Sequence, residues 1–171
     1  MILAHIGEFP LTFSQDIQHI LCFEPDPYAF KALQLNTKEF KNITLFPFPL
    51  DSCDSEKELF IETKSADTSL YRPTKFSKIK KVKTYSLDSI KVDYKKYENI
   101  VIKLEAEGYE QEVLQGSLNT LKKVSEVYID VSPERDGESN KDEVSDILKK
   151  AGFNNIKINN NFILHATNGE I

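Results

Sequence analysis

The segment from Asn99 to Gly116 is the most informative about the fold and reads Asn-Ile-Val-Ile-Lys-Leu-Glu-Ala-Glu-Gly-Tyr-Glu-Gln-Glu-Val-Leu-Gln-Gly. Its apolar opening, Ile100 to Ile102, is typical of a strand that is covered on both faces. After Gly108, apolar residues recur at helical spacing through Val113, Leu114, Leu118 and Leu121. We therefore predict a buried strand, an acidic turn and a helix that packs back on the sheet.

The carboxylates of that turn, Glu105 and Glu107, have two explanations. A strand that ends in charge and a glycine places the charge at the carboxyl edge of a parallel sheet, where open α/β folds bind ligands. Alternatively, the strand leaves the core and meets an acidic helix start, which the helix dipole favours. The pattern by itself does not separate these explanations.

The composition is that of an ordinary globular protein. The chain has 171 residues, 40% hydrophobic and 29% charged, so we expect one domain over residues 1–171. The net charge of −5 argues against binding to nucleic acid or to an anionic membrane. We see no apolar run of the ~20 residues that a membrane span needs, and no secretory signal, so we expect a cytoplasmic protein. Cys22 and Cys53 have no metal-ligand spacing to a histidine, and no metal site is predicted.

The first half of the chain contains one short predicted helix, over 10–16, and four predicted strands, over 19–23, 42–48, 58–63 and 79–85. Asp26 and Pro27 predict a further helix start, with aspartate as N-cap and proline at the first helical position. Residues 64–77 form a predicted loop of a length that often binds ligands. The lysines of the strand over 79–85 fit an exposed strand that is protected from edge pairing.

The second half adds a strand over 127–131, a helix after Asn140 and a closing hairpin over 156–165. Asn140-Lys-Asp-Glu143 is a capping-box pattern. Strands alternate with amphipathic helices, which predicts an α/β fold with a doubly wound, mostly parallel sheet, helices on both faces and an antiparallel finish. The strand that should precede Gly7 is expected to be missing, because so little chain comes before that glycine.

Four acidic residues follow predicted strands, namely Glu24, Glu105, Glu107 and Asp130. One such residue is more often a solvated cap than a ligand contact, but four at one edge of a sheet favour a binding site. Glu24 is the most informative, because an acidic residue that closes a strand after a nucleotide-binding turn suits hydrogen bonds to ribose hydroxyls.

Four segments resemble the FkbM family of methyltransferases. His19 to Pro27 (His-Ile-Leu-Cys-Phe-Glu-Pro-Asp-Pro) is similar to its Phe-Glu-Pro-x-Pro segment, and Tyr85 to Ile90 to its Leu-Asp-Ser segment. Val101 to Gly116 resembles its Lys-Ile-Asp-x-Glu-Gly-x-Glu-x-x-Val-Leu-x-Gly segment, and Tyr128 to Ser132 resembles the acidic strand that follows. The resemblance implies a class I methyltransferase sheet of Rossmann type, S-adenosylmethionine as methyl donor, and a hydroxyl acceptor on a sugar or natural product.

The resemblance also implies residue roles. It assigns Gly7, Glu24, Asp51 and Glu105 to the cofactor, with Glu24 on the ribose and Gly7 beside the methionine portion. His5 is a further candidate contact to the cofactor. The expected partner is a small-molecule or glycan acceptor, and a homodimer remains open.

For catalysis, the resemblance places Glu105 and Glu107 at the reacting edge. Methyl transfer to oxygen needs alignment of the reactants and removal of the hydroxyl proton. His165, near the end of the last strand, is a candidate base.

The chain departs from the family pattern at its first motif, a strand that ends in Asp-x-Gly-x-x-x-Gly. Gly7 matches the last glycine, but Met1 and Leu3 stand at the aspartate and the first glycine. Pro49 stands where the family often has a small residue near the adenine, and Glu105 replaces the middle aspartate of the acidic motif. A non-catalytic methyltransferase-like domain used for binding or assembly therefore stays an alternative, as does a chain truncated at its start.

Overall fold

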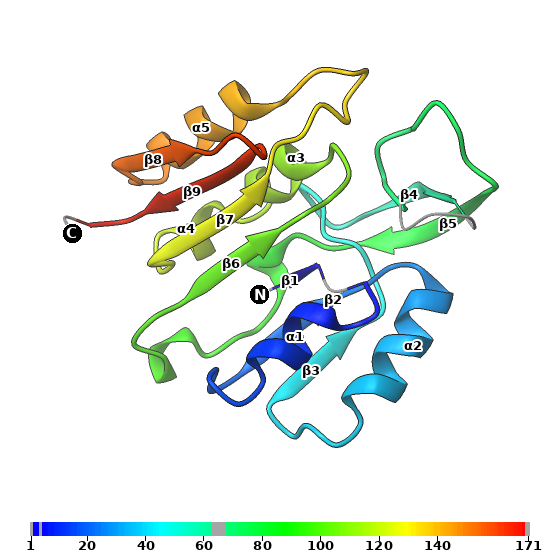
Figure 1. Ribbon diagram of the computed structural model, residues 1–171, viewed down its shortest axis with the longest axis horizontal. Coiled ribbons are helices and arrows are strands. Elements are labelled where there is room, and N and C mark those ends of the chain that lie inside the picture. The colour runs from blue at the N-terminus through cyan, green and yellow to red at the C-terminus, as the bar shows by residue number, and fades with distance from the viewer. Residues whose placement is uncertain (1, 4, 63–67, 170–171) are drawn as a thin grey trace.

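The computed structural model describes residues 2–3, 5–62 and 68–169. It contains a seven-stranded sheet beside a separate two-stranded hairpin (Figure 1). In spatial order the sheet strands are β3 (Ile43–Phe46), β2 (Ile20–Phe23), β1 (Ile2–Leu3), β6 (Val101–Leu104), β7 (Glu126–Asp130), β9 (Ile163–Thr167) and β8 (Asn155–Ile158). The helices are α1 (Glu8–Phe13), α2 (Pro27–Thr37), α3 (Glu110–Gln115), α4 (Leu118–Leu121) and α5 (Lys141–Lys150). No helix in these ranges is long and apolar enough to cross a bilayer.

The α/β class and the mostly parallel sheet are confirmed. Neighbouring strands from β3 through β2, β1 and β6 to β7 pair in parallel, and β9 is antiparallel to both β7 and β8. The doubly wound description holds only in part. The hairpin of β4 (Ser55–Ile61) and β5 (Lys78–Thr84) forms a second sheet, and Val101 and Tyr128 on the main sheet remain 40% and 39% exposed.

The expectation that the first strand is missing is wrong. Ile2 and Leu3 form β1, in register with Cys22 and Phe23 of β2, and Ile2 also pairs with Lys103 of β6. Two residues suffice because a strand on each side supplies ladder partners. The chain then turns at once, through positive φ angles at His5 (43°) and Gly7 (102°).

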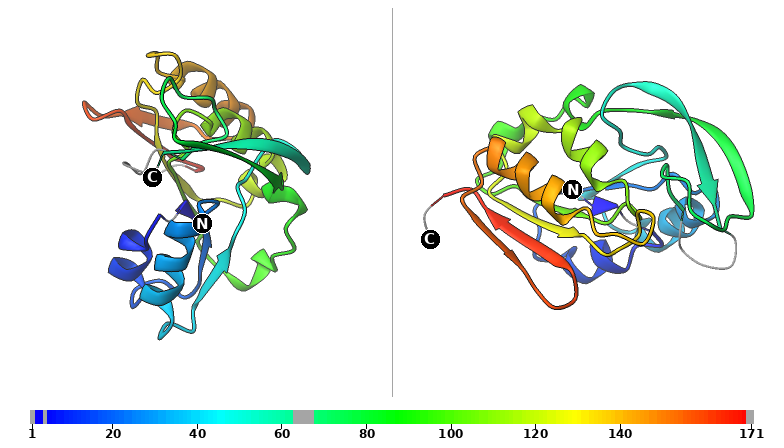
Figure 2. Two further views of the ribbon diagram at one scale, coloured as in Figure 1. Left: turned by 90° about the vertical axis from the view of Figure 1, so that its right-hand side faces the viewer. Right: turned by 90° about the horizontal axis from the view of Figure 1, so that it is seen from above.

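Two apolar clusters lie on opposite faces of the sheet. On one face, Ile20 and Cys22 of β2 pack with Leu33 of α2. On the other, Ile102 of β6 and Val127 of β7 pack against residues of α3 and α5. Figure 2 shows the corresponding arrangement, with α1 and α2 on one side of the strands and α3 and α5 on the other.

The helix predicted after Gly108 forms as two helices, α3 and α4, separated at Gly116 and Ser117. A Cβ at Gly116 would lie 2.0 Å from the backbone oxygen of Asp51. Such a contact is impossible for any other residue, so the glycine lets the strand–hairpin connection pass directly against the end of α3.

The two predicted helix starts differ in outcome. The Asp26 carboxylate accepts hydrogen bonds from the N–H groups of Tyr28 (2.8 Å) and Ala29 (2.9 Å), which confirms the predicted N-cap. The capping box at Asn140 is wrong, because its side chain does not cap α5. The Asn140 amide instead donates to Glu110 in α3, at 2.7 Å.

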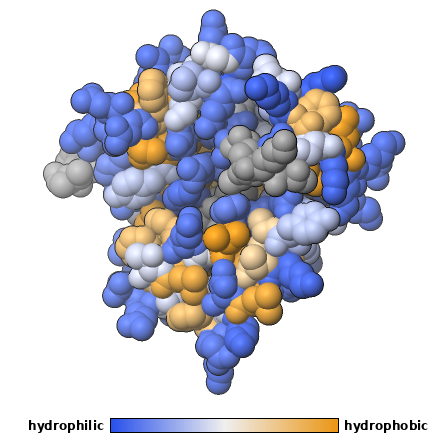
Figure 3. Space-filling model, turned by 45° about the vertical axis from the view of Figure 1, so that its right-hand side comes forward, coloured by the Kyte–Doolittle hydropathy of each residue, from blue (hydrophilic) through white to orange (hydrophobic). Residues whose placement is uncertain are grey.

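The hairpin lies beyond the carboxyl ends of β2, β6 and β7 (Figure 1). Its strands are the predicted ones over 58–63 and 79–85, each shifted toward its amino end by one to three residues. Of the predicted loop, residues 68–77 contain no helix or longer strand, and 64–67 lie outside the described residues. Figure 3 shows apolar residues gathered on the half of the molecule that α1, α2 and β3 form, where Phe13 and Leu35 are exposed.

Candidate active site

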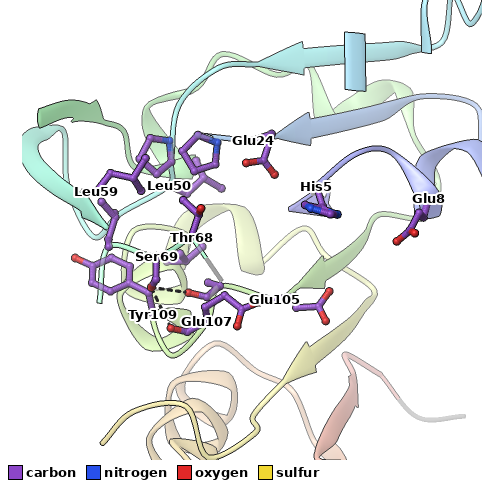
Figure 4. Close-up of a pocket in the computed structure, with 15 residues that line it drawn as sticks. His5, Glu8, Glu24, Leu50, Leu59, Thr68, Ser69, Glu105, Glu107 and Tyr109 are labelled. Atoms are coloured by element: carbon purple, nitrogen blue, oxygen red, sulfur yellow. Dashed lines mark hydrogen bonds between the residues drawn. The ribbon is translucent and has the colours of Figure 1, made fainter. Parts of the chain in front are cut away.

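A pocket of about 260 Å³ lies at the carboxyl ends of β2 and β6 (Figure 4). Leu59 of the hairpin and residues 68–70 of the predicted loop form part of its lining. Its lining residues are His5, Glu8, Glu24, Pro25, Pro49, Leu50, Leu59, Thr68, Ser69, Leu70, Glu105, Ala106, Glu107, Tyr109 and Val113. A second cavity of about 480 Å³ shares His5, Glu24 and Thr68 with it and adds Tyr28 and Lys78.

Glu24 stands between the two cavities. It directly follows β2, and its side chain is 7% exposed. One carboxylate oxygen accepts a hydrogen bond from the Asp26 N–H at 2.8 Å. Burial raises the pKa of Glu24 to about 7, because hydrogen bonds from the Asp26 and His5 backbones offset the loss of hydration only in part. A ligand that donates hydrogen bonds to this carboxylate would therefore stabilise its ionised form.

The acidic turn after β6 forms a second wall. Glu107 and Gly108 both have positive φ, at 51° and 86°, and the Tyr109 N–H donates to the Ala106 carbonyl at 3.2 Å. This is the geometry of a tight turn with two left-handed residues. The Ser69 hydroxyl lies within hydrogen-bond distance of the Ala106 and Glu107 carbonyls, at 3.2 and 3.0 Å, and so links the predicted loop over 64–77 to the turn.

The charged side chains that line the pocket are acidic. Four of its lining residues are acidic, namely Glu8, Glu24, Glu105 and Glu107, and its lining includes neither lysine nor arginine among the described residues. Lys103 pairs with Glu105 from the strand below. A cavity lined in this way attracts cationic ligands.

Among the residues assigned from sequence, the structure brings Glu24, Glu105, Glu107 and His5 to the pocket. Gly7 does not line the pocket, although the next residue, Glu8, does, and the role of Gly7 is in the backbone conformation. Gly7 is the N-cap residue of α1 and has a φ of 102°. A Cβ added at this position would lie 3.0 Å from the Leu33 side chain. Gly7 thus permits the turn and the close packing of α1 on α2.

Asp51 is not brought to the pocket. It is fully buried and is not among the residues that line the pocket. It accepts hydrogen bonds from the Ser52 N–H (2.7 Å), the Lys57 ammonium (3.0 Å), the Thr84 hydroxyl (3.0 Å) and the Tyr109 hydroxyl (3.0 Å). Burial alone would raise the pKa of Asp51, but these donors lower it below its ordinary value. Asp51 therefore ties the hairpin to the acidic turn.

His165 and Asp130 also lie outside the pocket lining. His165 sits on β9, where its ring stacks on Tyr128 with centroids 4.5 Å apart and pairs with Glu126. The Asp130 carboxylate accepts a hydrogen bond from the Ser132 N–H at 2.8 Å. The sequence placed His165 near a strand end, but the antiparallel register of β9 pairs it with Tyr128 in the middle of β7. Among the described residues we find no cluster of three or more potential metal-ligating side chains.

Sequence reasoning missed several residues of this region. Ser69 and Tyr109 line the pocket, and Glu110 is buried beneath the turn. The sequence does mark Glu110 as the third acid between Glu105 and Glu110. Whether its side chain points into the pocket or beneath the turn, however, depends on contacts with residues distant in the chain. Ser69 had none, because it comes from a stretch without periodicity.

Comparison with known proteins agrees with this fold. The family model of the methyltransferase FkbM domain matches residues 2–154. The crystal structure of methyltransferase FkbM from Methylobacillus flagellatus KT superposes with a TM-score of 0.63 at 14% identity, and covers 96% of this chain. This chain spans 41% of that protein.

A second structure is that of a TehB-like SAM-dependent methyltransferase from Corynebacterium glutamicum ATCC 13032 Kitasato, with a TM-score of 0.49 at 10% identity. The superposition covers 98% of this chain and 77% of the chain of that protein. No curated protein matches the sequence. The FkbM domain match extends over most of the chain, including both walls of the pocket, and so the chain belongs to the methyltransferase FkbM family.

Proposed function

We propose that the protein is an S-adenosylmethionine-dependent methyltransferase that methylates a hydroxyl group on a sugar or natural-product acceptor. The observation that carries the proposal is the pocket at the carboxyl edge of β2 and β6, whose charged lining is acidic. The ligand that the family uses is a cation, with a sulfonium and an ammonium group. The family membership and the charge of the pocket therefore support the same cofactor.

The described residues fit this cofactor at its ribose end. Glu24 is a buried carboxylate whose pKa is raised to about 7, because the hydrogen bonds that it accepts do not fully compensate for burial. Two ribose hydroxyls would donate to it and stabilise its ionised form. His5 and Pro25 flank it in the same wall. When bound, S-adenosylmethionine supplies an electrophilic methyl group.

Glu105 and Glu107 are the candidates at the reacting edge. Both line the pocket, and Glu105 directly follows β6. A carboxylate here can orient an acceptor hydroxyl and accept its proton. His165 lies on β9 outside the pocket, so we propose these two carboxylates for the role in its place.

Calorimetric titration of the protein with S-adenosylmethionine tests the cofactor. We expect binding, and weaker binding of S-adenosylhomocysteine because it lacks the sulfonium charge. Incubation with methyl-labelled cofactor and nitrogen-free polyols tests the acceptor class, since a methyl ether formed on a hydroxyl survives alkali whereas a methyl ester does not.

The non-catalytic alternative keeps one supporting observation. Asp51, assigned to the cofactor, does not line the pocket, and its carboxylate already accepts hydrogen bonds from Lys57 and Tyr109. Absence of S-adenosylmethionine binding at millimolar concentration would overturn the proposal and favour a domain used for binding or assembly. Binding without transfer to any polyol would overturn the acceptor assignment alone.

A further inference from the structure

Glu110 is a buried carboxylate that does not itself line the pocket. Its side chain is 1% exposed, although it stands at the first position of α3. One oxygen accepts hydrogen bonds from the N–H groups of Ala106 (2.7 Å) and Gly108 (3.2 Å), and the other accepts from the Asn140 amide (2.7 Å). These three donors lie outside α3, and the carboxylate also interacts with its own backbone N–H at the start of the helix.

The turn that it supports is unfavourable by itself. Glu107 has a φ of 51°, a conformation that non-glycine residues rarely adopt. The Ser69 hydroxyl and the Arg135 guanidinium hold the turn's carbonyls from outside, the latter at 3.2 Å from the Gly108 oxygen. Glu110 holds its amides from within. The backbone of the turn is thus fixed from three separate segments.

The Asn140 side chain forms its hydrogen bond to Glu110 in place of capping α5. Asn140 occupies the N-cap position of α5 but does not cap the helix, and its amide nitrogen points to Glu110 instead. Its amide oxygen is buried without a partner among the described residues. The start of α5 therefore lacks the side-chain cap that usually stabilises a helix, and Asn140 instead completes the set of hydrogen bonds to Glu110.

We propose that Glu110 is the positioning residue of the active site: by accepting from Ala106, Gly108 and Asn140, it fixes the turn that presents Glu105 and Glu107 to the cofactor. The inference rests on the proposed function for the identity of the ligand. The hold on the turn itself does not depend on that function.

Two substitutions separate this role from simple packing. Glu110→Leu introduces an apolar side chain of similar volume, which leaves the N–H groups of Ala106 and Gly108 without an acceptor. Glu110→Gln keeps an oxygen for those N–H groups, and its new amide can donate to the Asn140 oxygen after that side chain flips. Glu143→Gln, an exposed acid in the first turn of α5, is the matched control.

The measurements are amide hydrogen exchange at Ala106 and Gly108 by NMR, thermal unfolding, and calorimetric titration with S-adenosylmethionine. In Glu110→Leu we expect exchange of both amides to accelerate about 100-fold and cofactor affinity to fall about 30-fold. Glu110→Gln should restore both quantities to within about fivefold of wild type, and Glu143→Gln should change neither.

Wild-type exchange and affinity in Glu110→Leu, or equal defects in the leucine and glutamine variants, would overturn the proposal. If the leucine variant does not fold, Asn140→Ala removes a single donor and should accelerate the two amides about threefold to tenfold, and unchanged exchange would again overturn it. A wild-type protein that does not bind S-adenosylmethionine refutes the proposed function. In that case the exchange data still decide whether Glu110 fixes the turn.

Discussion

Two buried acids near the carboxyl edge of the sheet, Glu24 and Asp51, show opposite ways of burying a carboxylate. Both are less than a tenth exposed, at 7% and 0%. Burial dominates at Glu24 and raises its pKa to about 7, whereas donors from Lys57 and its neighbours hold the pKa of Asp51 below the ordinary value. Glu24 lines both of the cavities described above, and Asp51 lines neither of them.

The two acids differ in whether the protein itself supplies their hydrogen-bond donors. A carboxylate whose acceptor capacity is used by the protein contributes to stability, and its loss leaves donors unpaired. A carboxylate that is buried without full compensation lowers stability and is tolerated where a ligand completes its shell. The two acids therefore predict different phenotypes, in stability for Asp51 and in affinity for Glu24.

The largest effect is expected at Asp51. Asp51→Ala removes the acceptor of Tyr109, Thr84 and Lys57, and should lower the free energy of unfolding by about 3 kcal/mol because those donors lose a buried partner. Urea unfolding measures it. Glu56→Ala, an exposed acid on the same hairpin, is the control and should stay within about 0.5 kcal/mol of wild type. A loss at Asp51 no larger than that of the control would break the comparison.

The second effect is on affinity. Glu24→Gln should weaken S-adenosylmethionine by about 2 kcal/mol, or about 30-fold, because two charge-assisted hydrogen bonds to the ribose become neutral ones. Its free energy of unfolding should not fall, since the substitution removes an incompletely compensated buried charge. Calorimetry and urea unfolding of the same variant give both numbers. Unchanged affinity together with a loss of stability would make Glu24 a structural acid like Asp51.

The smallest effect is in the pH dependence. Ligand binding favours the ionised form of Glu24, so the affinity contributed by this group should rise about tenfold between pH 6 and pH 8. The stability sign is opposite. With a folded pKa of about 7 and an ordinary value of 4.5, the folded state binds more protons between these values, and the contribution of Glu24 to stability falls as pH rises through them.

The ratio of wild-type to Glu24→Gln affinity isolates this titration from that of the ligand's own ammonium group. A ratio that stays constant from pH 6 to pH 8 would show that Glu24 is already ionised at pH 6 or does not meet the ligand.

Local patterns in the sequence determined the elements that carry the site. The apolar run that ends in Glu24, the Asp26–Pro27 helix start and the strand before Glu105 all formed where predicted, because strand burial and N-capping depend on residues a few positions apart. The edge of the sheet at which the acids gather follows from the parallel order of those strands. Glu24, Glu105 and Glu107 could therefore be predicted as neighbours.

Tertiary structure decided which way each acid points. Asp51 meets Tyr109 across 58 residues of sequence, and Glu110 meets Asn140 across 30. The side of β9 on which His165 lies depends on its antiparallel register with β7. The two-residue β1 is stable because β2 and β6 flank it. Pairings of this kind are set by packing and hydrogen-bond satisfaction among distant segments, which no local pattern encodes.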